Sequence, residues 1–131
     1  MEKTRSALDL IGEATAHFNA RDFDSIRALL HPDVTWAPDP SWPEPGPYRG
    51  REAAMGFITD FIAPFASAQL VVDELVEVRG HGVARGRWVI EGASSGIAAD
   101  VPFTFVISER DGLIDAYWAF FDHEQALASI P

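Results

Sequence analysis

Apolar side chains recur at helical spacing near the start of the chain. Between residues 4 and 19, Leu8, Ile11, Thr15 and Phe18 follow one another at intervals of three or four positions. Residues with this spacing lie on one side of an α-helix. The pattern therefore predicts an amphipathic first helix that turns these four side chains toward the core.

A second, shorter helix is predicted directly after the first. Asp22 follows a break in the pattern and is a residue type that caps helix N-termini. The apolar positions after it are Phe23, Ile26 and Leu30, and the helix is expected to end before the histidine–proline pair that comes next. Residues 33–37 alternate weakly between apolar and polar types, which predicts a short strand.

The stretch from residue 33 to residue 50 is predicted to lead from this short strand into a long loop. It contains five prolines, each of which removes a backbone donor and fixes φ. It also contains Trp36, Trp42 and Tyr48, and aromatic side chains gathered in this way favour contact with an apolar cavity or a partner. We interpret the stretch as the rim of a pocket that the rest of the chain builds.

A third helix is predicted between Gly50 and Pro64. Its apolar positions keep helical spacing, at Ala54, at Phe57 or the next residue, and at Phe61 or the next residue.

Beyond this helix the pattern changes to that of β-strands. Four runs rich in Val, Ile, Phe and Trp are bounded by turn residues, and they cover residues 69–80, 81–92, 97–112 and 113–122. The glycine-containing turns between the first two runs and between the last two are the clearest hairpin signals. Helices followed by a curved antiparallel sheet predict an α+β fold.

The last strand is apolar on both of its faces. One face is predicted to carry Ile114, Ala116, Trp118 and Phe120, and the other Tyr117, Ala119 and Phe121. A sheet with helices on one face normally shows polar residues on the other. We therefore expect a homodimer in which a second subunit covers the outer face, with Trp118 at the contact. Asp122, followed by Gln125, predicts a capping box and a final turn of helix.

The composition is that of one globular domain spanning residues 1–131. Hydrophobic residues make up 47% of the chain, and no apolar run approaches the roughly 18 residues that a membrane span needs. The N-terminus lacks the apolar core and cleavage site of a secretory signal. A cytoplasmic location and no membrane partner are therefore expected.

Charge and metal-binding residue types exclude further classes. Twenty acidic and ten basic residues give a formal net charge of −10, which repels nucleic acid. The chain has no cysteine, which excludes disulfides, thiolate nucleophiles and cysteine-ligated zinc. The four histidines show no ligand spacing, so we expect no metal and no cofactor.

Four short motifs occur in an order and spacing that resemble those of the nuclear transport factor two-like superfamily. They are Asn19-Ala20-Arg21-Asp22-Phe23-Asp24, His31-Pro32-Asp33-Val34, Tyr48-Arg49-Gly50-Arg51-Glu52-Ala53 and Asp111-Gly112-Leu113-Ile114. Within this superfamily the chain is most similar to SnoaL-like polyketide cyclases and ketosteroid isomerase-like proteins, over nearly its whole length. The resemblance implies a cone-shaped, cystatin-like α+β barrel that holds a small apolar ligand and dimerises through its sheet.

The resemblance also implies a candidate general base. Matched outward from Asn19, the base of ketosteroid isomerases falls at or next to Asp39, which precedes a proline as the family's base does. The family's two oxyanion donors, a tyrosine and a protonated aspartic acid, fall on Ala14 and on Val101 or Phe103. Because losing even one such donor typically costs about 2.7–4 kcal/mol, ordinary ketosteroid isomerase activity is not expected.

Each candidate catalytic residue has a structural alternative. Asp39 is either a base whose pKa the aromatic rim raises or a turn-forming residue between two prolines. Tyr117 is either an oxyanion or orienting donor or a core residue whose hydroxyl reaches water. Asp100 is either a site carboxylate or a solvated residue at a strand end. Together with Arg87 and Asp115 it has the residue types of the superfamily's epoxide hydrolase site, but strand parity places the arginine opposite the apolar face.

Aromatic residues supply the expected pocket. Some must be core, and the excess is predicted to line an apolar cavity for a ring-containing or hydrocarbon ligand. The candidate pocket residues are Phe18, Trp36, Trp42, Tyr48, Phe61, Trp88, Phe103, Phe105 and Phe121.

Three functions remain open from the sequence. The first is a cofactor-free isomerase, cyclase or hydrolase-like enzyme in which Asp39 moves a proton on an apolar substrate. The second is a binding protein that uses the same cone without catalysis. The third is an interaction protein whose outer sheet face is the functional surface.

Overall fold

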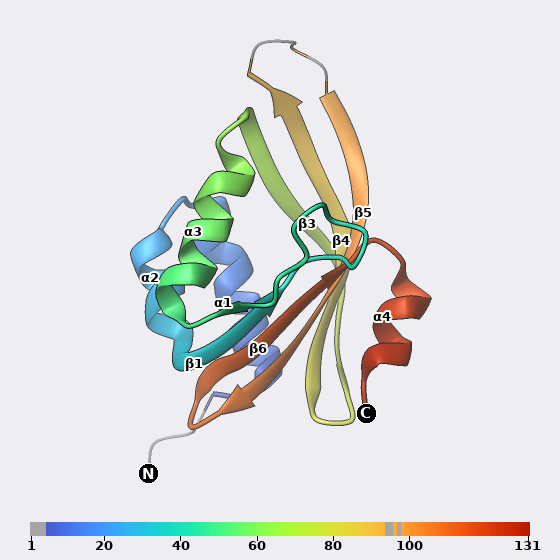
Figure 1. The fold of residues 1–131 in the computed structure, drawn as a ribbon. Coiled ribbons are helices and arrows are strands. Elements are labelled where there is room, and N and C mark those ends of the chain that lie inside the picture. Colours follow the sequence, from blue (N-terminus) through green and yellow to red (C-terminus); the bar gives the residue numbers. More distant parts are fainter. Residues whose placement is uncertain (1–4, 94–95, 97) are drawn as a thin grey trace.

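The structure is a computed structural model that describes residues 5–93, 96 and 98–131. Within these residues the chain forms four helices and six strands (Figure 1). In chain order they are α1 (Ala7–Asn19), α2 (Phe23–Leu29), β1 (Leu30–Ala37), β2 (Tyr48–Arg49), α3 (Arg51–Ile62), β3 (Phe65–Val78), β4 (His81–Gly92), β5 (Ala98–Arg110), β6 (Leu113–Phe120) and α4 (His123–Ser129). The predicted α+β class is confirmed.

The described strands form one sheet in the order β2-β1-β6-β5-β4-β3. Neighbouring strands are antiparallel except for β1 and β6, which run parallel. The sheet curves around the first three helices, while α4 packs on its other side (Figure 1). This curvature gives the molecule a concave inner face and an outer face.

The helix α1 begins later than the sequence pattern suggested. Ser6 and Asp9 form a capping box, in which the Ser6 hydroxyl accepts from the Asp9 N–H and the Asp9 carboxylate accepts from the Ser6 N–H. The buried face is shifted from the predicted one and consists of Ala7, Leu10, Ile11, Ala14 and Phe18. The predicted core positions Leu8 and Thr15 are only half-buried, at the edge of this face.

Asn19 fastens the end of α1 to the edge strand β3. Its side-chain amide donates to the Leu70 carbonyl at 2.9 Å, and its side-chain oxygen accepts from the Leu70 N–H at 2.8 Å. The side chain thus takes the place of a neighbouring strand. Arg21 adds a second tie by donating to the Ala68 carbonyl. These contacts fix Phe18, the last buried residue of α1, over the concave face.

An extra residue in β6 changes which side chains point inward. Ser108 pairs with Ala116, whereas the next residue along β5 pairs with Ile114, so Asp115 has no partner across the strand. This irregularity is a β-bulge. It places Ile114 in the same inner cluster as Tyr117, although the alternating pattern had predicted opposite faces. The assignment of Ile114 to the outer face was wrong because a bulge breaks the period of two.

The outer face carries a row of apolar side chains across four strands. Val76, Val83, Val106 and Trp118 are successive cross-strand partners. The helix α4 covers part of this row, and its Ala126 is fully buried there. The helix α4 of the same chain therefore covers part of the outer face that we expected a second subunit to cover. The homodimer with Trp118 at the contact stays a prediction.

Glycine at position 86 is required by the close approach of two strands. A Cβ atom on Gly86 would lie 1.9 Å from the Val71 carbonyl oxygen of β3. We expect Gly86→Ala to lower the free energy of unfolding by about 1–3 kcal/mol, because the backbone of β3 would have to move.

The matched control is Gly56→Ala in α3, where a Cβ atom would meet no heavy atom within 4 Å. This variant should gain about 0.5–1 kcal/mol from helix propensity. Denaturant unfolding of both variants measures the effects. A Gly86→Ala variant as stable as the parent would contradict the close approach.

Candidate ligand site

The concave face and the helices partly enclose a cavity of about 80 Å³ that is open to solvent on one side. Its walls come from α1, α2, α3, β1 and the loop after it, and the strands β3 to β6. Ala14 and Phe18 line it from α1, and Ile58 and Phe61 line it from α3. The described lining residues include no lysine, arginine or histidine.

Aromatic rings form a connected surface along the strand side of the cavity. The rings of Phe103 and Phe105 are stacked with centroids 4.2 Å apart. Trp88 lies across them and also contacts Phe18 and Phe61, each with ring centroids 5.2 Å away. All five were candidate pocket residues, and all five line the cavity. Such a surface suits the flat face of a ring-containing molecule.

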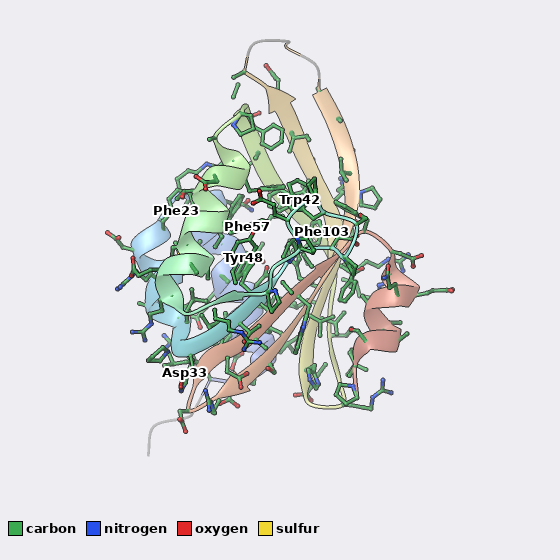
Figure 2. The ribbon with its side chains drawn as sticks, in the orientation of Figure 1. Phe23, Asp33, Trp42, Tyr48, Phe57 and Phe103 are labelled. Atoms are coloured by element: carbon green, nitrogen blue, oxygen red, sulfur yellow. The ribbon has the colours of Figure 1, made fainter. Side chains whose placement is uncertain are left out.

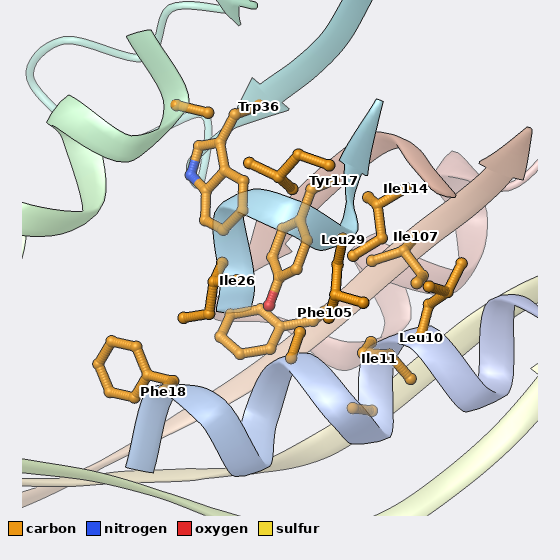
Figure 3. Close-up of a cluster of buried hydrophobic side chains, with 14 of the residues drawn as sticks. Leu10, Ile11, Phe18, Ile26, Leu29, Trp36, Phe105, Ile107, Ile114 and Tyr117 are labelled. Atoms are coloured by element: carbon orange, nitrogen blue, oxygen red, sulfur yellow. The ribbon is translucent and has the colours of Figure 1, made fainter. Parts of the chain in front are cut away.

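Trp36 and Tyr117 extend this wall, and the ring of Tyr117 lies beside that of Phe105 with centroids 5.2 Å apart. Trp36 and Tyr117 are partners in the parallel pairing of β1 with β6, and their rings stack at 3.9 Å with an angle of 12° between planes (Figure 3). Tyr117 is 5% exposed, and burial raises the pKa of its phenol far above the ordinary value. The side chain is therefore a neutral hydroxyl at any physiological pH.

The proline-rich loop closes one side of the cavity with Trp42. Its ring contacts Phe61 at 5.4 Å and Phe57 at 6.3 Å between centroids. Figure 2 shows Trp42, Tyr48 and Phe57 between the loop and α3. Tyr48 packs on Phe57 and donates to the Glu44 carbonyl, so it supports the loop from a second, more open hollow outside the cavity. The predicted pocket residue Tyr48 is thus not part of the cavity wall.

Asp39 ties the proline-rich loop to the end of β6. It is 7% exposed, and one carboxylate oxygen accepts from both the N–H and the hydroxyl of Ser41, at 2.9 and 2.6 Å. The other oxygen accepts from the backbone N–H of Phe121 at 2.8 Å. Phe121 itself is 41% exposed at the edge of the cavity. The carboxylate lies in the cavity wall, but its oxygens are already engaged by the protein.

These hydrogen bonds govern the charge of Asp39. Burial raises its pKa, but the donors from the Ser41 hydroxyl and from the Phe121 and Ser41 N–H groups outweigh burial, and the pKa lies below its ordinary value. A carboxylate stabilised in this way is a weaker proton acceptor than an ordinary aspartate. The geometry is that of a turn-forming Asp with an added long-range contact.

The structure does not bring Asp100 to the cavity. Its carboxylate lies 3.6 Å from the Arg87 guanidinium, and both side chains are about half exposed. Asp115 accepts from the Ser108 hydroxyl and lies 3.8 Å from the Arg110 guanidinium. Of the three residues named for an epoxide hydrolase arrangement, Arg87 and Asp100 therefore pair with each other, while Asp115 is held in a different contact.

Sequence reasoning missed Ser41 as the residue that holds Asp39. The signal was present in the run Asp39-Pro40-Ser41, because aspartate side chains commonly accept from the backbone two residues on. The second partner, Phe121, lies 82 positions away and could not be found from local pattern.

The described residues contain no group of three or more His, Asp or Glu side chains that could hold a metal ion. None of their helices combines the length and the apolar character needed to cross a membrane.

Comparison with known proteins places the chain among related sequences and folds. Residues 12–117 match the SnoaL-like domain family. A search of curated proteins found no match.

Three solved structures illustrate the structural likeness. A protein of unknown function from Burkholderia pseudomallei, described as NTF2-like, is 23% identical, with a TM-score of 0.78 over 95% of this chain and 96% of that one. TerC, co-crystallised with polyporic acid, is 22% identical, with a TM-score of 0.76 over 93% and 95%. A proposed polyketide cyclase from Pseudomonas putida is 15% identical, with a TM-score of 0.74 over 96% and 98%. At these identities the likeness shows the fold alone.

Removal of the Asp39 carboxylate should destabilise the protein through its lost hydrogen bonds. We expect Asp39→Ala to lower the free energy of unfolding by about 1–3 kcal/mol, because the Phe121 N–H and the Ser41 donors lose their acceptor. The control Ser41→Ala removes one hydrogen bond and should cost less. Equal losses in the two variants, measured by denaturant unfolding, would contradict the long-range tie.

Asp39 should also contribute to the acid sensitivity of the fold. Its pKa is lower in the folded chain than its ordinary value, so the stability it contributes is complete above the unfolded pKa, roughly 3.9, and is lost as pH falls through the folded pKa. As the pH falls from neutral to acid, the free energy of unfolding should therefore decrease less for Asp39→Asn than for the parent. Parallel acid-unfolding curves for the two proteins would contradict this assignment.

Proposed function

The chain belongs to the SnoaL-like domain family, as its motifs predicted, and we propose that it binds a small, neutral, ring-containing apolar molecule in the cavity of its cone. The observation that carries this proposal is the aromatic wall of the cavity, formed by Phe103, Phe105 and Trp88 together with Phe18 and Phe61, whose rings contact Trp88. Rings that pack on one another at such distances offer large apolar area for a flat ligand.

Electrostatics support a neutral ligand. The described lining contains no cationic side chain, and Asp39 adds a negative charge that is engaged by Ser41 and by the Phe121 N–H. A carboxylate or phosphate on the ligand would be buried here without a counter-charge, which is costly. The co-crystal of TerC with polyporic acid supports the idea that this fold can take a ring compound.

The catalytic alternative rests on the position of Asp39 in the cavity wall. If an isomerase or cyclase reaction occurs, Asp39 is the carboxylate placed to move a proton. Against this role, its pKa lies below the ordinary value, whereas a general base at neutral pH works best with a pKa near 7. We therefore favour binding, with Asp39 holding the loop, over proton abstraction.

Filling part of the cavity should weaken binding. The test is a titration with indane, a neutral hydrocarbon of fused rings, in which the fluorescence of the tryptophans in the cavity wall reports binding. The variant Ala14→Leu adds side-chain volume inside the cavity and should weaken indane binding at least tenfold. The matched control Ala16→Leu lies on the exposed side of the same helix and should leave binding unchanged.

The binding site can also be mapped on the parent protein, which does not depend on the folding of Ala14→Leu. Methyl NMR of the parent protein with indane should shift the signals of Ile26, Ile58 and Leu70, which line the cavity. The signal of Val76, exposed on the outer face, should stay unchanged. No shift in the cavity methyls at saturating indane would overturn the proposal.

A further inference from the structure

A second hollow lies between the proline-rich loop and α3, outside the cavity. Its volume is about 400 Å³, which is within the roughly 300–1,000 Å³ that is typical of small-molecule sites. Three aromatic side chains of the loop and α3 border both spaces, whereas Glu44, Tyr48 and Asp60 border the second hollow and not the cavity. A molecule bound in the second hollow would therefore contact residues that the cavity does not use.

Aromatic rings form walls of the second hollow. The rings of Tyr48 and Phe57 lie with centroids 5.0 Å apart and planes inclined by 40°, and Trp42 meets Phe57 at 6.3 Å and 74°. Figure 2 shows these three side chains between the loop and α3. Because the planes are inclined to one another, the rings do not form a single flat surface. The face of each ring is the negative part of its quadrupole and attracts cations.

Two carboxylates, those of Glu44 and Asp60, also line the second hollow. Both side chains are exposed, and neither forms a hydrogen bond or an ion pair with any residue that the structure describes. The described lining contains no lysine, arginine or histidine. The chain as a whole has a formal net charge of −10. The second hollow therefore combines aromatic faces and negative charge, and its described lining supplies no cation to balance them.

Hydrogen bonds hold the loop side of the second hollow in place. The Trp42 N–H donates to the Asp39 carbonyl at 2.9 Å and closes a turn. The Tyr48 hydroxyl donates to the Glu44 carbonyl at 2.9 Å, and Tyr48 also pairs with Trp36 across β2 and β1. The aromatic walls are thus positioned before a ligand arrives, which lowers the cost of ordering them on binding.

We propose that the second hollow binds a small quaternary ammonium ion, with its methyl groups against the rings and its charge balanced by Glu44 and Asp60. A neutral apolar molecule would gain nothing from the two carboxylates. A primary ammonium ion is strongly hydrated through its N–H groups, whereas a quaternary one has no N–H group to satisfy when it contacts a ring. This inference concerns a different site from the cavity and does not depend on the binding function proposed there.

The experiment compares choline with 3,3-dimethylbutan-1-ol, a neutral alcohol of the same shape that has carbon in place of the nitrogen. Both are titrated into the parent protein, and the backbone amide NMR signals of Ala53 and Gly56 report binding in the second hollow. We expect saturable shifts with choline and an affinity about three- to tenfold higher than that of the alcohol. The methyl signals of Ile26 and Leu70, which line the cavity, should stay unchanged.

Charge-removing variants test the role of the carboxylates. Glu44→Gln and Asp60→Asn should each weaken choline binding about two- to fivefold and leave the affinity for the alcohol unchanged. The matched control is Glu77→Gln, which removes the same charge from an exposed residue of β3 outside the second hollow. This control should leave the affinity for choline unchanged, because the ion does not contact Glu77.

A blocking variant separates the two sites. Gly56 lines the second hollow from α3, and a Cβ atom there would meet no heavy atom within 4 Å. Gly56→Leu should therefore fold, fill part of the second hollow and weaken choline binding, while binding of indane in the cavity stays unchanged.

The outcomes decide this inference separately from the function proposed for the cavity. The inference is overturned if choline gives no saturable shift at Ala53 and Gly56, or if the alcohol binds as tightly as choline. It is also overturned if choline shifts Ile26 and Leu70 instead, since the ion would then occupy the cavity. Binding that is selective for choline and is weakened by Glu44→Gln but not by Glu77→Gln supports the assignment. None of these results depends on whether indane binds.

Discussion

The inward direction of Tyr117 depends on one extra residue in β6. Asp115 interrupts the alternation of the strand, so Ile114 and Tyr117 both reach the inner cluster. Without the bulge, either Ile114 would point away from the core or every later residue of β6 would point to the opposite face of the sheet. The same bulge leaves Trp118 and Phe120 on the outer side, where Phe120 packs under α4. A single register shift thus decides which side chains of β6 face the cavity and which face α4.

The proline-rich loop shows how a segment without its own backbone pattern can be positioned. Its prolines cannot donate hydrogen bonds, so regular pairing is not available to hold it. A carboxylate supplies the missing anchor, because Asp39 joins Ser41 to the Phe121 N–H at the end of β6. The lowered pKa of Asp39 follows from that anchoring. In this protein, fixing the loop and keeping a basic carboxylate are opposing demands, and the geometry favours the first.

Local chemistry was sufficient to predict most of the fold. The cap at Asp22, the stop before Pro64 and the turn at Asp111 and Gly112, both of which have positive φ, all follow from short-range rules. Strand parity placed Trp88, Phe103 and Phe105 on one face, and the structure brings them together around the cavity.

The parts that were not predicted depend on long-range contacts. The bulge at Asp115 has no turn or glycine signal in the sequence. The buried face of α1 includes Ala7, whose carbonyl oxygen would lie 2.6 Å from a Cβ atom on Gly82 of β4, and the partner of Asp39 at Phe121 lies at the far end of the chain. For the same reason, the walls of the cavity assemble only when segments from α1 to the end of β6 have all packed. A molecule that occupies the cavity therefore has affinity for the native state alone, and thermodynamic linkage would add RT ln(1 + [L]/Kd) to the free energy of unfolding of the entire domain.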